Sequence, residues 1–315
     1  MKSLAPILVT YNSSVVIDAC LQSLRGHPVV VVDNASSDDT CQRVREYPNA
    51  RLIANASNRG FASAVNQAVC ASDADAFLLL NPDAELLTEL DTALPLLERY
   101  GLVTGRLLDD EGVDQRGFGI RRFPTAMSMV FEVLGLNKLW PSNPINARYR
   151  YLDRDLHKSG EVEQPAGAFL YFRRDVWSKL GGFDEDFAPI WFEDVDFCVR
   201  ASEAGYPAWY ESTLQAKHRG GHSILPLVAS SRITYWYVSL LRYAAKHFRP
   251  VSFRGVCVAV ILGAPPRLIL DTFREGSLTP LKAYWKTIRF ATLCLLTPSL
   301  ARPALVFGGA SRIRG

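Results

Sequence analysis

The sequence lacks the short patterns that mark several large classes of enzyme. It contains no GxxxxGK(S/T) phosphate loop, no GxGxxG after the first predicted strand, no GxSxG turn and no zinc-spaced set of Cys and His. Each of these patterns reflects a chemistry that needs those residues at that spacing. Their absence argues against a P-loop kinase, a dinucleotide-dependent dehydrogenase and a serine hydrolase.

Cysteine is also sparse. The six cysteines are widely spread and form no CxxC pair, so we expect reduced, buried thiols and no disulfide framework. After one lysine, the N-terminus has only the run LAPILV before the polar residues TYNSS, which is too short for a signal peptide. We therefore expect the protein to stay in the cytosol.

No uncharged apolar run reaches the roughly 18–20 residues that would span a bilayer. The longest is GVCVAVILGAPP, residues 255–266, which Arg254 and Arg267 flank. This segment fits either a core helix or a helix that lies in the membrane interface, and the sequence leaves both readings open.

What the sequence does have is an uneven distribution of charge. The formal net charge is only +3, and 48% of the 315 residues are hydrophobic, as in a folded globular protein. Residues 1–229 carry 22 basic and 30 acidic side chains, whereas residues 230–315 carry 13 basic and 2 acidic ones. The basic C-terminal part indicates an anionic partner, a membrane surface or nucleic acid. No nucleic-acid recognition motif accompanies the charge, which favours the membrane.

The first hundred residues alternate short apolar strands with helical stretches. Strands are predicted at 7–12, 29–32, 50–55 and 76–80, and helices at 15–25, 41–47 and 61–74. This alternation predicts βαβ units, and therefore an α/β fold with a mostly parallel sheet. Ligands of such sheets bind beyond the carboxyl ends of the strands. Polar clusters follow three of the strands, at 10–12, 33–34 and 81–83, so we expect them to converge at one edge.

Two strand-end carboxylates have more than one reading. Asp33 ends a buried strand, where it can accept hydrogen bonds from a base or a ribose, or simply form a turn. Asp83 suits a divalent cation that also binds a diphosphate, although it can equally cap the helix that follows. Glu85 competes for the metal role, or is a first-turn helix acid.

Three acids in four positions, Glu193, Asp194 and Asp196, begin a predicted helix in WFEDVDF. They fit a solvated helix start, whose dipole favours acids. The interleaved Phe and Val residues indicate that some of them are partly buried, which suits a general base. Further on, His218 and His222 lie in KHRGGH, where a histidine is either structural or, beside Asp83, a metal ligand.

Seven stretches of the sequence match a known family, in the same order. The chain resembles the GT-A-fold glycosyltransferases of family 2, most closely the bacterial rhamnosyltransferase-like branch, over roughly residues 4–225. The matching stretches are VTYNSS (9–14), VVVDNASSDDT (30–40), NRGFASAVNQA (58–68), LLLNPDAEL (78–86), GAFLYFRRDVWSKLGGFDEDF (167–187), WFEDVDFCVRASEAGY (191–206) and HRGGHS (218–223).

The resemblance implies a role for each matching position. Asp194, with Glu193 beside it, would be the catalytic base, and Trp191 would lie near the acceptor. Asp83 would bind Mg²⁺ or Mn²⁺ on the donor diphosphate, and His218 would complete the metal site or contact the diphosphate. The residues implied to bind the nucleotide and the donor are Thr10, Tyr11, Asn12, Asp33, Asn58, Gly60, Asn66 and Asn81.

One implied position departs from the widest family pattern. Asn81 stands where the first carboxylate of a DxD motif would be, and a neutral amide is a weaker metal ligand. The rhamnosyltransferase-like branch often has NPD at this place, so the departure leaves the resemblance intact.

The implied reaction is an inverting transfer of a sugar, with rhamnose as the best candidate, in cell-surface polysaccharide synthesis. The donor would be dTDP-rhamnose or a UDP-sugar, and the acceptor a lipid-linked glycan or an oligosaccharide. Two alternatives are a non-catalytic, nucleotide-binding subunit of a membrane assembly complex and a metal-dependent nucleotidyltransferase. The full NPD, Glu-Asp and His218 set argues against the first. The lack of Lys and Arg in VTYNSS argues against the second.

We expect a catalytic domain at 1–229, with a donor-binding half at about 1–100 and an acceptor and base half at about 101–229. Residues 230–315 would form a basic, aromatic, helical tail. Its opening, SSRITYWYVSLLRYAAKHFRP, is typical of a helix in the headgroup zone of an anionic bilayer. We therefore expect a cytoplasmic protein, peripheral at the inner face of the cytoplasmic membrane. A helix that packs on the catalytic domain is the alternative.

Overall fold

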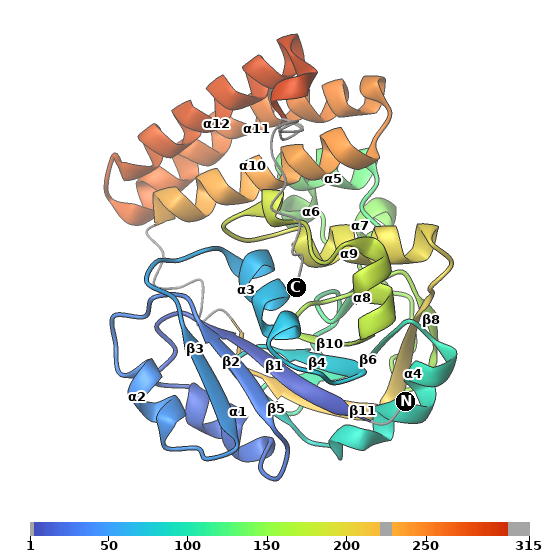
Figure 1. Ribbon diagram of the computed structural model, residues 1–315. Coiled ribbons are helices and arrows are strands. Elements are labelled where there is room, and N and C mark those ends of the chain that lie inside the picture. The colour runs from blue at the N-terminus through green and yellow to red at the C-terminus, as the bar shows by residue number, and fades with distance from the viewer. Residues whose placement is uncertain (1–2, 221–228, 302–315) are drawn as a thin grey trace.

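The computed structural model describes residues 3–220 and 229–301. A central sheet with helices on both faces makes up one part, and three long C-terminal helices lie together above it (Figure 1). His222, the end of the HRGGHS stretch and residues 302–315 of the expected tail lie outside the described residues.

Within the described residues, nine strands form the central sheet, in the order β3-β2-β1-β4-β10-β6-β11-β5, with β8 paired to β11. The strands of this sheet are β1 (Leu4–Thr10), β2 (Val29–Asp33), β3 (Ala50–Ala54), β4 (Ala76–Leu80), β5 (Ala84–Leu86), β6 (Leu102–Leu108), β8 (Gly160–Val162), β10 (Phe169–Arg173) and β11 (Ala208–His218). A small second sheet pairs β7 (Ile120–Arg121) with β9 (Gln164–Pro165).

The predicted α/β fold with a mostly parallel sheet is confirmed. Strands β3, β2, β1 and β4 are all parallel, as the βαβ pattern of the first hundred residues requires. The sheet becomes mixed beyond β4, because β10 runs antiparallel to both of its neighbours. Strand β10 is therefore the point where the two halves of the sheet join.

Helices cover both faces of the sheet, which explains why its central strands are apolar along their whole length. β2 and β4 are buried at every position. Helices α1 (Ile17–Ser23), α2 (Thr40–Arg45) and α4 (Leu94–Arg99) pack on one face, after the short 3₁₀ helix η1 (Leu90–Ala93). Helices α3 (Phe61–Cys70), α8 (Arg174–Leu180) and α9 (Glu193–Glu203) pack on the other.

The C-terminal helices share a third apolar core with the catalytic part. They are α10 (Ala229–His247), α11 (Pro250–Glu275) and α12 (Thr279–Leu296), followed by η3 (Pro298–Leu300). This core also takes in side chains of α5 (Ala126–Val133), α7 (Pro144–Tyr149), η2 (Glu185–Phe187) and α9, and α6 (Leu136–Leu139) packs on α5. The tail is thus packed against the domain that carries the candidate base.

One side of the first tail helix packs inside the protein. Tyr237, Leu240, Leu241 and Tyr243 of α10 are at most 3% exposed. Their aromatic and aliphatic surface fills the third core, where its transfer out of water stabilises the fold. The alternative reading, a helix packed on the catalytic domain, describes α10.

The apolar segment 255–266 lies inside α11. Among the described helices, α11 alone is long and apolar enough, by length and composition, to cross a membrane, and a third of its most apolar window is buried. One side of α11 packs on α5 and α12. The segment is therefore a core helix on that side.

The cysteines are free, and Cys20, Cys198, Cys257 and Cys294 are buried as expected. Cys41 is half-buried, and Cys70, at the end of α3, is exposed, contrary to the expectation of burial.

A glycine allows α11 to approach α5 closely. A Cβ atom on Gly263 would lie 2.3 Å from the carbonyl oxygen of Val133, closer than any real contact. The same carbonyl accepts a hydrogen bond from Arg267 Nε at 3.1 Å, and Arg267 also donates to the carbonyl of Glu132. Arg267 therefore caps the C-terminal end of α5 from the tail, and Gly263 provides the space for this contact.

We expect Gly263→Ala to lower the free energy of unfolding by about 1–3 kcal/mol, because the added methyl group forces the two helices apart. Gly255→Ala, in the same helix, is the matched control, since a Cβ there meets nothing within 4 Å. That change should be neutral or stabilise by up to about 1 kcal/mol, because Ala is the better helix former. Urea unfolding measures both, and equal effects would show that the close helix contact does not matter.

Candidate functional site

The polar clusters after β1 and β2 meet at one edge of the sheet, as expected. Thr10 pairs with Asp33 in the parallel register of the two strands, and Thr10 Oγ1 donates to Asp33 Oδ1 at 2.8 Å. Asn12 lies in the left-handed region at φ 50°, and its side-chain oxygen accepts from Ser37 N at 2.8 Å. Tyr11 is half-buried between them. The two loops thus form one hydrogen-bonded unit.

The carboxylate of Asp33 is largely occupied by this unit. Besides Thr10, the backbone N–H of Ser36 donates to Oδ2 at 2.8 Å, and the Ser36 hydroxyl donates to Oδ1. Asp33 is only 1% exposed. The turn therefore uses most of the hydrogen-bonding capacity of Asp33.

The three residues expected to shape the donor pocket lie at two places. Asn58 is exposed and accepts from Gly60 N at 2.9 Å. Gly60 has φ 85°, and a Cβ there would lie 3.2 Å from Pro189 O, so its backbone approaches the 188–190 loop closely. Both belong to the segment that leads into α3.

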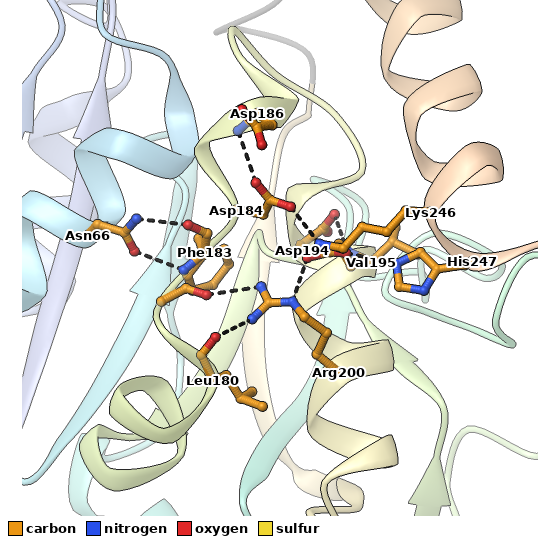
Figure 2. A network of polar contacts seen from close by, with 12 residues as sticks. Asn66, Leu180, Phe183, Asp184, Asp186, Asp194, Val195, Arg200, Lys246 and His247 are labelled. Carbon is orange, nitrogen blue, oxygen red and sulfur yellow. Dashed lines mark hydrogen bonds and ion pairs between the residues drawn. The ribbon is translucent and has the colours of Figure 1, made fainter. Parts of the chain in front are cut away.

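Asn66 holds the loop after α8 by hydrogen bonds (Figure 2), and it does not line the cavity that contains Asp194. Its amide group donates to Phe183 O at 2.8 Å and to Glu185 Oε1 at 3.0 Å. Its oxygen accepts from Phe183 N at 2.9 Å and from Trp177 Nε1 at 3.0 Å. All four of its hydrogen-bonding positions are therefore used within the chain, where they join α3 to the loop after α8.

Asn81, Asp83 and His218 come together although 137 residues separate the first from the last. Asn81 Nδ2 lies 3.3 Å from His218 Nε2, and Asp83 Oδ1 lies 3.4 Å from the same nitrogen. The side chains of Asp83 and His218 are almost fully buried. β11 pairs with β5, with His218 opposite Ala84, and this strand pairing delivers the histidine to the NPD turn.

A residue that the sequence did not single out orients this histidine. Gln115 Oε1 lies 2.9 Å from His218 Nδ1, and Gln115 Nε2 donates to the His218 carbonyl at 2.6 Å. Phe118 stacks on the imidazole, with 5.2 Å between ring centroids. This arrangement assigns the proton to Nδ1 and leaves Nε2 as the acceptor that faces Asn81 and Asp83. The described residues contain no cluster of three or more His, Cys, Asp or Glu that could hold a metal.

Glu193 and Asp194 begin α9 after two residues in the left-handed region. Trp191 and Phe192 have φ values of 81° and 71°, which are rare for bulky side chains and typical of functional sites. Asp194 Oδ2 accepts from Gly167 N at 2.8 Å, and Oδ1 accepts from Val195 N at 2.8 Å. Both oxygens are therefore fixed in direction by backbone donors.

Burial acts differently on the three acids of α9. It raises the pKa of Asp194, although the backbone donors of Gly167 and Val195 and the charge of Arg121 oppose the rise. Burial and the neighbouring Asp194 raise the pKa of Glu193 well above its usual value, and Glu193 Oε2 is buried with no hydrogen-bond partner in the described residues. Burial of its carboxyl group therefore favours the protonated form of Glu193.

Asp196, the third acid, has a structural role. It is fully buried, and its oxygens accept from Arg200 Nε, His247 Nε2 and Lys246 Nζ, each at 2.7 Å. Lys246 and His247 belong to α10, so this acid joins the helix of the candidate base to the tail. The sequence does not distinguish it from Asp194.

Four of the residues that the sequence singled out line a pocket of about 320 Å³, and Asp83 and His218 are not among them. Asn81, Trp191, Glu193 and Asp194 all line it, so the NPD turn and the candidate base face one cavity. Its wall also holds the side chains Phe61, Phe118, Arg121, Met129, Glu132, Tyr149, Arg150, Gln164, Ile190, Phe192, Val195 and Trp236. Sequence reasoning missed Arg121 and Arg150. The arginine-rich run QRGFGIRR (115–122) was the available signal for Arg121.

Comparison with known proteins agrees with this geometry. The sequence profile of the family described as "Glycosyl transferase family 2" matches residues 7–180. The N-acetylglucosaminyl-diphospho-decaprenol L-rhamnosyltransferase of Mycobacterium tuberculosis is 29% identical over 250 residues, which cover 71% of this chain and 78% of that protein. Rhamnosyltransferase WbbL of Escherichia coli K12 is 26% identical over 255 residues, which cover 76% and 92%.

Two solved structures share the fold. The mannosyltransferase PcManGT from Pyrobaculum calidifontis, solved with GDP-Man and Mn²⁺, has a TM-score of 0.50 and 18% identity, with 94% of this chain and 87% of that chain covered. GalNAc-T7, solved with UDP, GalNAc and Mn²⁺, has a TM-score of 0.52 and 13% identity, with 78% and 51% covered. The chain belongs to glycosyl transferase family 2 and is a glycosyltransferase with the GT-A fold.

Proposed function

We propose that this chain is an inverting glycosyltransferase that moves a sugar from a nucleoside diphosphate to a glycan hydroxyl in cell-envelope polysaccharide synthesis. One observation carries the proposal: Asn81 of the NPD turn and Asp194 line the same pocket. Rhamnose is the best candidate sugar, because two relatives are named as rhamnosyltransferases. dTDP-rhamnose is the corresponding donor, with a UDP-sugar as the other candidate.

Asp194 is the proposed general base. It would take the proton of the acceptor hydroxyl as that oxygen attacks the anomeric carbon from the face opposite the diphosphate, which inverts the configuration. The raised pKa of Asp194 makes the carboxylate a stronger base, and the N–H groups of Gly167 and Val195 hold it in one orientation. Burial and the charge of Asp194 raise the pKa of Glu193 well above its usual value, which favours the negative charge of the pair on Asp194.

The residues at the NPD turn fit a divalent cation. His218 Nε2 and Asp83 Oδ1 both carry lone pairs and face each other at 3.4 Å, an arrangement that a cation between them would stabilise. Gln115 supplies the outer hydrogen bond that metal-bound histidines usually have. A nitrogen ligand beside the carboxylate favours Mn²⁺ over Mg²⁺. When bound, such an ion would stabilise negative charge on the leaving diphosphate.

The outer side of α11 and α12 is the proposed membrane-facing surface. Val251, Val258, Leu262, Ile269 and Phe273 are exposed and recur at helical spacing along α11. The exposed large apolar residues near and along α12 are Leu278, Leu281, Trp285, Leu293 and Leu296. A soluble monomer rarely exposes so many apolar side chains close together.

Cations accompany these apolar side chains. Arg254, Arg274, Lys282, Lys286 and Arg289 are exposed on the same two helices. Exposed apolar residues with interspersed Lys and Arg fit the interface of an anionic bilayer. We therefore propose a cytoplasmic protein, peripheral at the membrane, where a lipid-linked acceptor would be found.

We expect Asp194→Asn to lower kcat by about 10²–10⁴-fold, because the amide cannot accept the proton, and to leave nucleotide binding nearly unchanged. The wild-type rate should fall as pH drops through the raised pKa of Asp194, since the base must be ionised. Nucleotide release with a donor panel measures kcat, and calorimetry measures binding. Asp175→Asn, an exposed ion-paired acid away from the pocket, is the control. Turnover of the Asp194 variant above a few per cent of wild type would refute the assignment.

His218→Gln should weaken Mn²⁺-dependent binding of a nucleoside diphosphate by at least about tenfold, because the proposed site loses one of its two strong ligands. Calorimetric titration with dTDP and with UDP, at several Mn²⁺ concentrations, measures this loss. His157→Gln, at an exposed histidine, provides the comparison. If His218→Gln binds the nucleotide with the same Mn²⁺ dependence as the wild type, His218 does not belong to a metal site.

Replacing Phe273 and Trp285 together by Ser should abolish flotation with anionic liposomes, because both are exposed, at 84% and 67%, near the turn between α11 and α12. Tyr284 donates to Asp271 at 2.7 Å, which holds the two helices together there. The double change of Val15 and Leu139 to Ser is the control, since these are as exposed (75% and 82%) but lie outside the tail. Unchanged flotation of the Phe273 and Trp285 variant would exclude this surface.

A further inference from the structure

Two arginines of the pocket have no task in the reaction as described. Arg121 and Arg150 both line the cavity that holds Asp194. A sugar hydroxyl is neutral and needs no cation, and two positive charges near the general base weaken its basicity. Arg121 in particular opposes the rise in the pKa of Asp194. Because the positive charge of Arg121 weakens the proposed base, we expect it to serve another purpose, the binding of an anionic ligand.

The two guanidinium groups are held side by side by shared contacts. Arg121 Nε donates to the carbonyl of Gly117 at 2.9 Å, and Arg150 Nη1 donates to the same oxygen at 3.3 Å. The ring of Tyr149 lies next to both, with 5.9 Å and 6.0 Å from its centroid to the two guanidinium carbons. Two like charges on one carbonyl oxygen repel each other, so the arrangement is stabilised when an anion binds between them.

The backbone at Gly117 allows the two arginines to lie close together. Gly117 has φ 76°, and a Cβ there would lie 2.9 Å from Arg150 Cβ, so the turn requires glycine. Arg150 is further held by Asn146 Oδ1 at 3.0 Å and by Glu132 Oε2 at 3.4 Å. No ion pair within 4 Å holds Arg121 among the described residues, and its Nη atoms donate no hydrogen bond there. The pair therefore keeps a net positive charge toward the pocket.

We propose that Arg121 and Arg150 bind the phosphate groups of the acceptor, so that the chain selects acceptors whose glycan is joined to a lipid through a diphosphate. Guanidinium groups bind phosphate oxygens by two parallel hydrogen bonds, which suits this chemistry. Their partners Glu132 and Tyr149, together with Met129 and Trp236, come from α5, α7 and α10. These helices form the tail side of the pocket, whereas Asn81 lies on the sheet side.

The inference rests on the proposed function and names the acceptor of that same site. A donor diphosphate has the same chemistry, so the experiment must distinguish the two sources. The probe is farnesyl diphosphate, titrated by calorimetry into the full chain that is already saturated with dTDP and Mn²⁺. Farnesol, which has the same hydrocarbon and no phosphate, is titrated in parallel.

Arg121→Gln should weaken farnesyl diphosphate binding by about 10- to 100-fold, the effect of losing charge-assisted hydrogen bonds, and leave farnesol and dTDP binding unchanged. Arg121→Lys keeps the positive charge but loses the two parallel N–H donors of the guanidinium group, so its loss of affinity for farnesyl diphosphate should be intermediate. Arg122→Gln is the control, because Arg122 is the next residue, pairs with Glu163 at 3.6 Å and does not line the pocket. Its affinity should equal that of the wild type.

Three outcomes would overturn the inference. They are no measurable binding of farnesyl diphosphate to the wild-type chain, equal affinity in the Arg121→Gln and Arg122→Gln variants, and a loss of dTDP affinity in Arg121→Gln that places the cation in the donor site. Thermal unfolding identifies a variant that fails to fold, in which case Arg121→Lys decides. Failure of the proposed function has a different signature, since a chain that is no transferase would bind no dTDP with Mn²⁺ at the outset.

Discussion

The position of the candidate base depends on a buried carboxylate two residues away, Asp196. Burial alone would raise the pKa of Asp196, but the hydrogen bond from His247 and the charges of Arg200 and Lys246 outweigh it and lower the pKa to about 2. Because the unfolded value is about 3.9, the ionised form stabilises the fold at neutral pH, and this stabilisation is lost as the pH falls from about 4 toward 2. Leaving such a charge without partners costs about 3–5 kcal/mol.

The same network joins α9 to the end of α8, to the loop that follows α8 and to the distant helix α10. Arg200 also donates to the carbonyls of Leu180 and Gly182 at the end of α8, and Lys246 pairs with Asp184 in the loop that follows. Farther along that loop, Ser239 of α10 donates to Ile190 O at 3.0 Å, next to the strained residues Trp191 and Phe192. Each such left-handed residue costs about 1–3 kcal/mol, so the loop needs external support. The tail helix α10 supplies that support.

The uneven charge of the chain is divided between two tasks in the folded protein. Some basic residues of the tail have partners inside the protein. Lys246 and His247 contact the carboxylate of Asp196, and Arg267 caps α5. The remaining cations of α11 and α12 stay exposed beside apolar side chains. Acidic and basic side chains are also grouped within the pocket, where Glu193 and Asp194 form one pair and Arg121 and Arg150 form another. The small net charge of +3 hides both separations.

The amino-acid sequence by itself determined the α/β order of the first hundred residues and the edge where their polar clusters gather. Hydrophobic period and strand-end position are local properties, so the positions of Thr10, Asp33 and Asp83 follow from them. The tertiary structure alone decided which acid of WFEDVDF is buried with cations and which faces the cavity, because Asp194 and Asp196 differ only in what packs against them. Their partners, Gly167 and His247, lie 27 and 51 residues away. The arginine pair was equally hidden, since Arg121 and Arg150 meet only where the fold brings both to the carbonyl of Gly117.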